Sequence, residues 1–324
     1  MSCDYRSKRY VLMQGVPGGK FDAPSADYPW TNDTNVALCR MLHANASHVN
    51  NPDVDYTADI YFLVLLDTEL YERYIEFIRQ VHSHGGKVIL CISSDHRFMV
   101  GQGLLNSRGL NYTHVCDEVD LIFSQVAESL KLYGRNQHKV IGVGMIPERI
   151  NFGLPYEQRD IDLLLSGTIP AELSLSYALE IMMMIKEKYP HLKIAYPTNH
   201  CDILRPLYPG IDFIEVSSVP PGSGLVSLLK RSKYYINPEL RPTAGRSMVE
   251  SFYCRTPYIC SNMTYASKYF PDFTYGNLDL ENIVNIFDKL LSSNRDEIIK
   301  KAEDLVEDDY IDNLMPRVMQ RLYS

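Results

Sequence analysis

No stretch of this 324-residue sequence is apolar for long enough to cross a membrane, which takes about 20 consecutive residues. The first residues, MSCDYRSKRY, also lack the apolar core of a signal peptide. With 45% hydrophobic and 22% charged residues, the composition is that of an ordinary globular protein. We therefore expect a protein with no membrane partner that stays in the cytoplasm.

Paired cysteines are also missing. The seven cysteines are odd in number, none forms a C-x-x-C pair, and most lie within apolar segments. This pattern argues against a zinc site or a disulfide framework and indicates buried thiols in a reducing compartment. The cysteines are Cys3, Cys39, Cys91, Cys116, Cys201, Cys254 and Cys260.

Excess positive charge is absent as well, because 32 Lys and Arg face 40 Asp and Glu and give a net charge of −8. The net charge is −3 for residues 1–150 and −5 for the remainder, so neither half is a basic domain. This balance disfavours DNA as a partner, although a locally positive groove is compatible with it. The motif G-x-x-x-x-G-K-[ST] and the dinucleotide fingerprint are absent too, which argues against a kinase, an ATPase or a dehydrogenase.

What the sequence does contain is a regular alternation of short apolar runs and amphipathic segments. This alternation is typical of β-α-β units, so we expect an α/β protein with two Rossmann-like doubly wound domains. A linker with two prolines and a glycine, 147–158, separates domains 1–150 and 151–324, the second ending in a long helical tail. The expected strands are 10–14, 59–66, 87–92, 120–124 and 139–143 in the first half, and 162–166, 193–196, 212–216, 234–236 and 257–260 in the second. The expected helices are 33–44, 69–84, 128–133, 174–188, 222–230, 280–291 and 295–322, with a further helix that opens at Gly245.

The stretch 229–261 has the layout of a ligand-binding site. A strand leads into a polar loop with Arg241 and Thr243, and a helix then opens at Gly245 with Arg246 and Glu250 one turn apart. A helix N-terminus that follows a parallel strand offers free N–H groups to an anion, here supplemented by two guanidinium groups. In the alternative interpretation, Arg246 and Glu250 form only an exposed ion pair at i and i+4.

Further candidate residues follow the ends of other expected strands, where parallel sheets place their ligands. Gly18 and Gly19 belong to a glycine-rich turn after strand 10–14, and Gly167-Thr168 follow strand 162–166. Asp95 follows strand 87–92. An ordinary glycine loop and a turn-capping aspartate are the alternative interpretations.

Two tandem Rossmann-like domains with such a site in the second resemble the GT-B glycosyltransferases. Gly245, Glu250 and Pro257 fit the pattern of that family, whereas Pro242 and Arg255 depart from the pattern of its retaining branch. The resemblance implies that the second domain binds a nucleotide diphosphate sugar, that the first presents the acceptor, and that the two face each other across a cleft. It also implies that no metal is required, although Mg²⁺ is possible.

Within that fold, short segments of both domains are similar to the DNA β-glucosyltransferases of phages, which act on hydroxymethylpyrimidines in DNA. The similar segments are 94–98, 123–125, 146–150, 161–167 and 246–250. By this resemblance, Asp95 is the catalytic base of an inverting transfer from UDP-glucose, Asp33 is a second acidic residue of the active site, and Glu250 holds the ribose. Arg246 neutralises the diphosphate, with Lys230 or Arg241 in place of arginines that the family carries after its glycine pair. Arg97, Arg108 and His114 are the candidates for acceptor binding.

Three functions follow from these observations. The first is transfer of a sugar from a UDP-sugar to a 5-hydroxymethylpyrimidine in DNA, in the host cytoplasm if the protein is viral. The second is the same chemistry on a glycan or a small molecule, which suits the acidic surface better. The third is a catalytically silent module that binds sugar nucleotides. In each case we expect a monomer.

Overall fold

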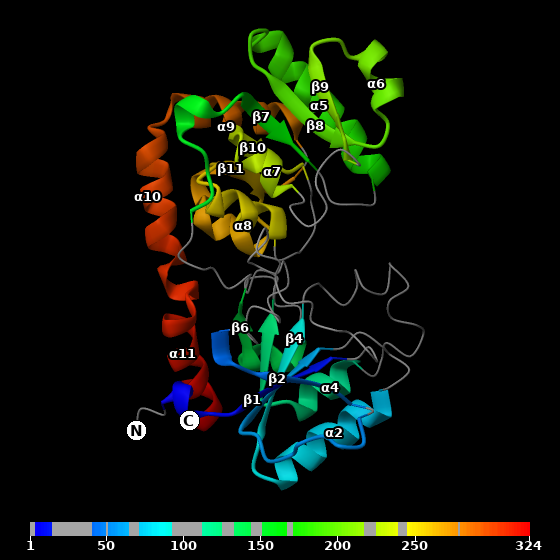
Figure 1. Cartoon of the computed structure of the whole chain (residues 1–324), viewed down its shortest axis with the longest axis vertical. Coiled ribbons are helices and arrows are strands. Elements are labelled where there is room, and N and C mark those ends of the chain that lie inside the picture. The colour runs from blue at the N-terminus through cyan, green and yellow to red at the C-terminus, as the bar shows by residue number, and fades with distance from the viewer. Residues whose placement is uncertain are drawn as a thin grey trace. The chain divides into compact units, whose positions relative to one another are not determined.

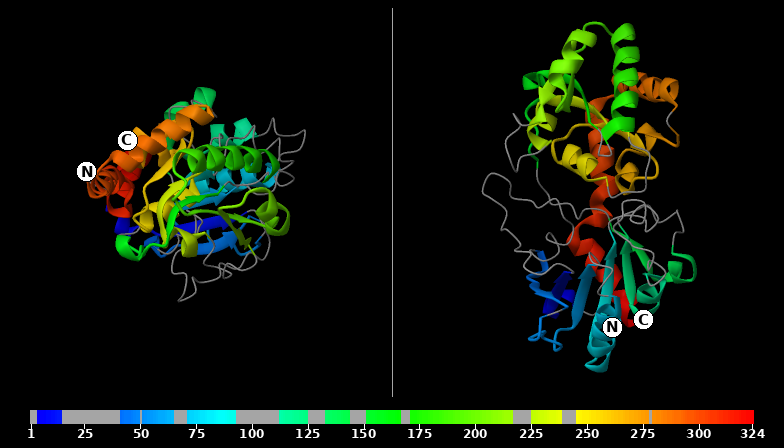
Figure 2. Two further views of the ribbon diagram at one scale, coloured as in Figure 1. Left: turned by 90° about the horizontal axis from the view of Figure 1, so that it is seen from above. Right: turned by 90° about the vertical axis from the view of Figure 1, so that its right-hand side faces the viewer.

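The computed structural model describes residues 4–14, 41–49, 51–64, 71–92, 112–124, 133–143, 151–166, 171–216, 225–238, 245–277 and 279–324. The chain divides into two units, each built around one parallel sheet with helices on its faces (Figures 1 and 2). Unit 1 comprises Met1–Pro147, Pro242–Ala244 and Asp308–Ser324, and unit 2 comprises Glu148–Arg241 and Gly245–Glu307. None of the helices in the described ranges combines the length and the apolar character that crossing a membrane requires.

The sheet of unit 1 has six strands in the order β2-β1-β3-β4-β5-β6, and every neighbouring pair is parallel. The strands are β1 (Tyr10–Gln14), β2 (Asn45–His48), β3 (Ile60–Val64), β4 (Lys87–Ile92), β5 (Leu121–Ser124) and β6 (Val140–Gly142). The sequence predicted all of them except β2. The chain order reverses between β1 and β3, which makes the carboxyl ends of these strands the switch point of the sheet.

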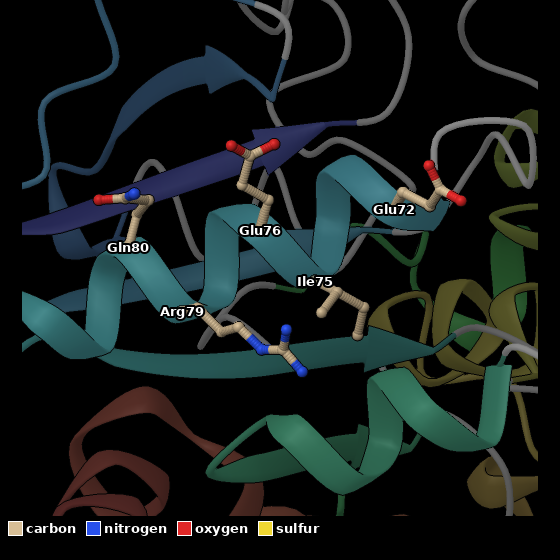
Figure 3. A pocket seen from close by; sticks show the side chains of 5 residues that line it. All are labelled: Glu72, Ile75, Glu76, Arg79 and Gln80. Carbon is tan, nitrogen blue, oxygen red and sulfur yellow. The ribbon is translucent and has the colours of Figure 1, made fainter.

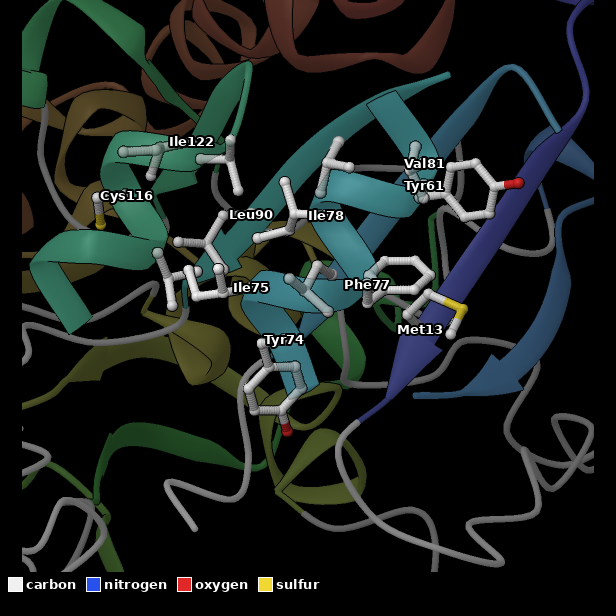
Figure 4. Packing of buried hydrophobic residues seen from close by; sticks show 14 of the residues in the cluster. Met13, Tyr61, Tyr74, Ile75, Phe77, Ile78, Val81, Leu90, Cys116 and Ile122 are labelled. Atoms are coloured by element: carbon white, nitrogen blue, oxygen red, sulfur yellow. The ribbon is translucent and has the colours of Figure 1, made fainter. Parts of the chain in front are cut away.

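Successive residues of these strands point to opposite faces, and both faces are apolar. Helices α2 (Tyr71–Ser83) and α4 (Tyr112–Glu118) cover one face, where Tyr74, Ile78 and Val81 pack against Leu90 and Ile122 (Figure 4). Helix α2 ends in the sequence Gly85-Gly86. Gly85 has a left-handed φ of 80° and Gly86 donates its N–H to the carbonyl of Val81 over 3.0 Å, a glycine stop of the kind common at helix ends.

The other face of this sheet is covered by a helix from the far end of the chain, α11 (Ile311–Tyr323). Its apolar stripe packs on the alternate residues of β1, β3 and β5, and Arg321 donates to the carbonyl of Val140 over 2.7 Å. We expected residues 151–324 to form one domain with a continuous helical tail. This expectation is wrong for the last residues, because Asp308–Ser324 belong to unit 1 and the tail is not one helix. The tail breaks into α10 (Arg295–Val306) in unit 2, a short turn, and α11 in unit 1, because Tyr310 is extended at φ −61° and ψ 143°. The residues of the stripe are Leu314, Met315, Val318, Met319 and Leu322.

Unit 2 has a second parallel sheet of six strands, in the order β12-β11-β10-β7-β8-β9. When the strands are numbered along the chain within the unit and the sheet is read from β9, the order is 3-2-1-4-5-6, as in dinucleotide-binding folds, and it reverses between β7 and β10. The strands are β7 (Ile161–Leu165), β8 (Ile194–Thr198), β9 (Ile211–Glu215), β10 (Ser232–Ile236), β11 (Tyr258–Ser261) and β12 (Thr274–Tyr275). The remaining helices are α5 (Ala171–Lys188), α6 (Cys201–Leu207), α7 (Val226–Leu229), α8 (Arg246–Tyr253) and α9 (Leu280–Ser292).

Short 3₁₀ segments complete the described elements. In unit 1 they are η1 (Tyr5–Ser7) and η5 (Gly134–Lys139), and in unit 2 they are η6 (Tyr156–Gln158), η8 (Tyr265–Tyr269) and η9 (Pro271–Phe273). The turn between α10 and α11 is η10 (Glu307–Asp309).

Candidate functional site

The strongest candidate site lies at the carboxyl ends of β7 and β10, where the strand order of unit 2 reverses. Ser166 directly follows β7, and its N–H donates to the carbonyl of Ile236 at the end of β10 over 3.2 Å. The hydroxyl of Tyr235 lies 2.7 Å from Oγ of Ser166. Tyr235 is fully buried, and this burial raises the pKa of its hydroxyl. Ligands of doubly wound folds bind in the crevice outside such a pair of strand ends.

Helix α8 begins beside these strand ends, and a glycine determines how it begins. Gly245 has φ 77° and ψ 47°, a left-handed conformation that L-residues with side chains rarely adopt. A Cβ at this position would overlap the methyl group of Thr264 and lie 2.8 Å from Cε of Met248. No side chain of the described residues caps the helix, and the carbonyl of Gly245 accepts from the N–H of Met248 over 3.0 Å, so among the described residues the N–H groups of Arg246 and Ser247 have no acceptor. The positive end of α8 is therefore open to an anion.

Asn237, the residue after β10, fixes the first turn of α8 from the side. Its side-chain amide donates to Oγ of Ser247 over 3.1 Å and to Sδ of Met248 over 3.3 Å. Its own carbonyl accepts a hydrogen bond of 2.6 Å from the Tyr275 hydroxyl. Sequence reasoning missed Asn237, Ser247 and Tyr235. The only available signal was that Asn237 is a polar residue directly after an apolar strand.

Glu250 lies one turn into α8 and is only 3% exposed. It is close enough to Tyr235 for its charge to help raise the pKa of that hydroxyl, after the larger effect of burial. The interpretation of Glu250 as one half of an exposed surface ion pair is therefore wrong. Glu250 thus places a buried carboxylate in α8, one turn from the start of the helix.

The carboxyl end of α8 is held by two arginines. Arg159 is 4% exposed and donates to the carbonyl of Cys254 and to Oγ1 of Thr256, over 2.7 and 2.8 Å. Burial, and then the charge of Arg295, lower the pKa of Arg159 to about 10. Arg295 donates to the carbonyl of Arg255 over 2.6 Å. Cations are favourable at this end of a helix, so α8 is anchored opposite to its open end.

The structure does not bring Lys230 to this site. Lys230 precedes β10, whereas Asn237 follows it, and five strand residues at about 3.3 Å each separate the two edges of the sheet. The ammonium group of Lys230 lies 5.4 Å from the centre of the Phe152 ring instead. The prediction that Lys230 binds the diphosphate is therefore wrong.

Most of the other predicted site residues lie outside the described part of the chain. Within it, His114 is an exposed residue in the first turn of α4, in unit 1, and Gly245 and Glu250 lie together in unit 2. Arg246 begins α8, but its side chain is not described. The residues outside the described ranges are Gly18, Gly19, Asp33, Asp95, Arg97, Arg108, Gly167, Thr168, Arg241 and Thr243. In the sequence, Asp95 comes three residues after the end of β4 and Gly167 directly follows Ser166.

Two hollows of the surface lie elsewhere and are weaker candidates. One, of about 470 Å³, is lined on its described side by a single face of α2, with Glu72, Glu76 and Arg79 (Figure 3). Arg79 is already paired with Glu118 over 2.7 Å. The other, of about 290 Å³, lies at the amino edge of the unit 2 sheet, where Arg231 pairs with Asp160. Side chains that already form ion pairs have few hydrogen-bonding positions free for a ligand. Parallel sheets also bind their ligands at the carboxyl edge, which is opposite to the second hollow.

No group of three or more His, Cys, Asp or Glu side chains within the described ranges could hold a metal ion. Among the described residues, the polar groups at the switch point of unit 2 are hydroxyls, an amide and backbone N–H groups, together with the carboxylate of Glu250. Such a set suits an anionic, hydroxyl-rich ligand better than a cation.

No family model matches this sequence, and no curated protein sequence matches it either. The chain is nevertheless similar to solved structures with two Rossmann-like units. A mutant of S. aureus TarM in complex with Fondaparinux, alpha-GlcNAc-glycerol and UDP superposes with a TM-score of 0.60 at 11% identity, over 82% of this chain and 55% of that chain. This chain thus spans little more than half the length of TarM.

Two further structures are similar over nearly their whole length. The N-terminal domain of Candida albicans trehalose-6-phosphate phosphatase has a TM-score of 0.61 at 9% identity, over 98% of this chain and 96% of that chain. An α-glucosyltransferase in complex with UDP and a 13-mer DNA containing an HMU base has a TM-score of 0.59 at 9% identity, over 98% and 100%. The α/β fold expected from the sequence, with two Rossmann-like units as in GT-B glycosyltransferases, is confirmed.

Proposed function

We propose that this protein is a glycosyltransferase that moves a sugar from a UDP-sugar to a hydroxyl group of an acceptor. The uncapped start of α8 at the switch point of unit 2 is the observation that carries the proposal, since it suits a diphosphate. The likeness to TarM and to an α-glucosyltransferase, both in complex with UDP, supports it. This donor site does not require a metal, because backbone N–H groups and arginines supply the positive charge.

In this proposal the donor lies along the carboxyl edge of the unit 2 sheet. The N–H groups of Arg246 and Ser247 donate to the diphosphate, and the guanidinium groups of Arg246 and Arg241 add charge. Glu250 accepts hydrogen bonds from the two ribose hydroxyls. Gly167, Thr168 and Thr243, which adjoin Ser166 and Gly245 in the sequence, are further proposed donor-binding residues, as are Gly18 and Gly19.

The proposed reaction is an inverting displacement. The acceptor oxygen attacks the anomeric carbon and loses its proton to the carboxylate of Asp95, while the bond to UDP breaks and the diphosphate leaves with both electrons. Asp33 is a second acidic residue at this site. The position of Asp95, just beyond the end of the central strand β4, supports a place at the ligand-binding edge of unit 1.

For the acceptor we propose 5-hydroxymethylpyrimidine in DNA, held by Arg97, Arg108 and His114. The likeness to an α-glucosyltransferase in complex with UDP and a 13-mer DNA containing an HMU base supports this choice. An enzyme that acts on a base within a duplex must first flip it out. The net charge of −8 favours a glycan or a small molecule as the second candidate acceptor.

Transfer of labelled glucose from UDP-glucose tests the activity and the acceptor together. The acceptors are matched duplexes that contain 5-hydroxymethyluracil, 5-hydroxymethylcytosine or only unmodified bases, and a sample without DNA measures donor hydrolysis. We expect label on the hydroxymethylated duplexes alone. Hydrolysis without labelled DNA would overturn the DNA acceptor and leave the transferase, whereas UDP binding without any turnover of several UDP-sugars would indicate a silent binding module.

Two further measurements test the chemistry. The Asp95→Asn variant should lose at least about 100-fold in turnover, as expected for a general base, while it still binds UDP. Asp53→Asn, an exposed residue before β3, is the matched control. Proton NMR of the product should show an inverted anomeric centre. Retention of configuration would overturn the inverting mechanism but not the transferase activity.

A further inference from the structure

We propose that Asn237 is a positioning residue for the diphosphate of the donor, and this inference rests on the proposed function. Asn237 contacts no reacting atom in this scheme. It acts through Ser247, the second residue of α8, whose hydroxyl accepts a hydrogen bond from the Asn237 amide over 3.1 Å. The same amide donates to Sδ of Met248 over 3.3 Å. Both acceptors belong to the helical turn whose N–H groups face the ligand.

Asn237 can impose a position on this turn because it is itself fixed by the sheet. It is 1% exposed, its N–H donates to the carbonyl of Ile259 in β11 over 3.0 Å, and its carbonyl accepts from the Tyr275 hydroxyl in β12 over 2.6 Å. Its backbone is therefore held by two neighbouring strands. The side chain transmits that fixed position to α8 across ten residues of sequence.

The remainder of α8 does not depend on this contact. Val249 and Phe252 are buried, and the carboxyl end of the helix is bound by Arg159 and Arg295. Loss of the Asn237 amide should therefore leave the helix folded and release only its first turn. The direction of two N–H groups changes, which matters for a bound anion far more than for the fold.

The test compares two variants that remove side-chain hydrogen bonds at opposite ends of α8, two bonds in Asn237→Ala and one in Ser251→Ala. Asn237→Ala removes the contact at the open end. Ser251→Ala, the matched control, removes the bond of 2.7 Å from the Ser251 hydroxyl to the carbonyl of Thr256 at the other end. The dissociation constant of UDP is measured by calorimetry at a temperature where all variants are fully folded. We expect binding to Asn237→Ala to be weaker by about five- to tenfold and binding to Ser251→Ala to change less than about twofold.

Steady-state kinetics and a second variant separate positioning from general damage. Asn237→Ala should raise the KM for the UDP-sugar by a similar factor and leave kcat within about twofold. Ser247→Ala, which removes the acceptor from a partly exposed position, should weaken UDP binding to the same degree. The double variant should then lose less affinity than the sum of the two single losses, because the two substitutions share the contact between Asn237 and Ser247.

Each outcome decides the question. Equal UDP affinity of Asn237→Ala and the wild type, or equal losses in Asn237→Ala and Ser251→Ala, would overturn the positioning role and leave the proposed function intact. A wild-type protein that binds neither UDP nor another nucleoside diphosphate would overturn the proposed function, and the positioning role with it. If Asn237→Ala does not fold, Ser247→Ala and Ser251→Ala are compared instead. Losses of UDP affinity that are equal in these two variants and additive in their double variant would also overturn the inference.

Discussion

The Tyr235 hydroxyl and Oγ of Ser166 lie 2.7 Å apart and join the carboxyl ends of the two strands between which the order of the unit 2 sheet reverses. We predict that Tyr235→Phe loses about 1–2 kcal/mol of unfolding free energy, because the buried Ser166 hydroxyl loses its partner. It should also weaken UDP binding several-fold.

Tyr258→Phe is the control for this prediction. It removes a comparable bond of 2.6 Å from a fully buried hydroxyl to the carbonyl of Ala266, on the neighbouring strand β11. Urea denaturation and UDP titration of both variants give the answer. We expect both variants to lose similar amounts of stability and only Tyr235→Phe to bind UDP more weakly. Equal UDP affinities of the two variants would contradict a ligand at the switch point.

Gly245 should not tolerate a side chain. We predict that Gly245→Ala costs more than about 2 kcal/mol, since the left-handed backbone and the overlap with Thr264 act together. Gly134→Ala separates the two effects, because Gly134 also has a positive φ, 53°, but no atom lies within 4 Å of the added Cβ. It should cost only about 1 kcal/mol. Thermal unfolding of both variants measures the difference, and equal losses would show that the overlap is relieved.

Unit 1 should lose stability in acid through Asp120. Burial raises the pKa of this carboxyl, but the ammonium group of Lys87 at 2.9 Å and the N–H of Val88 at 2.8 Å outweigh burial and hold the pKa below its usual range. A depressed pKa in the folded state contributes stability above the unfolded value of about 3.9, and this stability is lost as the pH falls through the folded pKa.

Asp120→Asn should therefore lose about 1–3 kcal/mol at pH 7. The difference between the variant and the wild type should begin to shrink below about pH 4, where the carboxyl protonates in the unfolded state, and should vanish as the pH falls through the lower pKa of the folded state. Urea denaturation at a series of pH values measures both quantities. A difference that stays constant down to pH 2.5 would mean that the charge of Asp120 contributes nothing.

The buried cysteines should be inert. Burial raises the pKa of Cys116 and of Cys254 to about 12, and that of Cys201 to about 11, so almost no thiolate exists at neutral pH. In the native protein these three cysteines should react with iodoacetamide more slowly than in urea by a factor of 100 or so. Peptide mass spectrometry identifies the labelled positions. Rapid native labelling of Cys254 would contradict the packing described at the carboxyl end of α8.

Removal of divalent metals should leave transfer unchanged. In the proposed site the leaving diphosphate is stabilised by the start of α8 and by arginines, so EDTA should change the rate of glucose transfer by less than about twofold. Assays with EDTA and with added Mg²⁺ decide this. A rate that falls more than tenfold with EDTA and returns with Mg²⁺ would show that a metal bridges the diphosphate.

The sequence predicted most strands because both faces of each sheet are buried, which makes the strands of a parallel sheet continuous apolar runs such as 60–64 and 87–92. Strand β2 was missed because its residues, Asn45–His48, are small or polar and carry no such signal. The break between α10 and α11 was missed because each helix has its own apolar stripe. Only the packing shows that Val306 faces unit 2 and Leu314 faces unit 1.

The candidate site was predictable where it depends on local order in the sequence and not where it depends on strand order. Gly245 was found because a glycine opens a helix after a polar loop. The contact between Tyr235 and Ser166 was out of reach, since nothing in the sequence says that β10 lies beside β7. Lys230 was misplaced because it was chosen by its charge, although a residue that precedes a parallel strand lies at the amino edge of the sheet, opposite to the site.

The position of α11 gives the chain an unusual order of assembly during synthesis. The ribosome completes the strands of unit 1 first, but the five apolar residues of α11 that pack on one face of that sheet emerge only with residues 311–323. All of unit 2 is made in the interval. The unit that is translated second can therefore complete its core before α11 completes the core of the unit that is translated first.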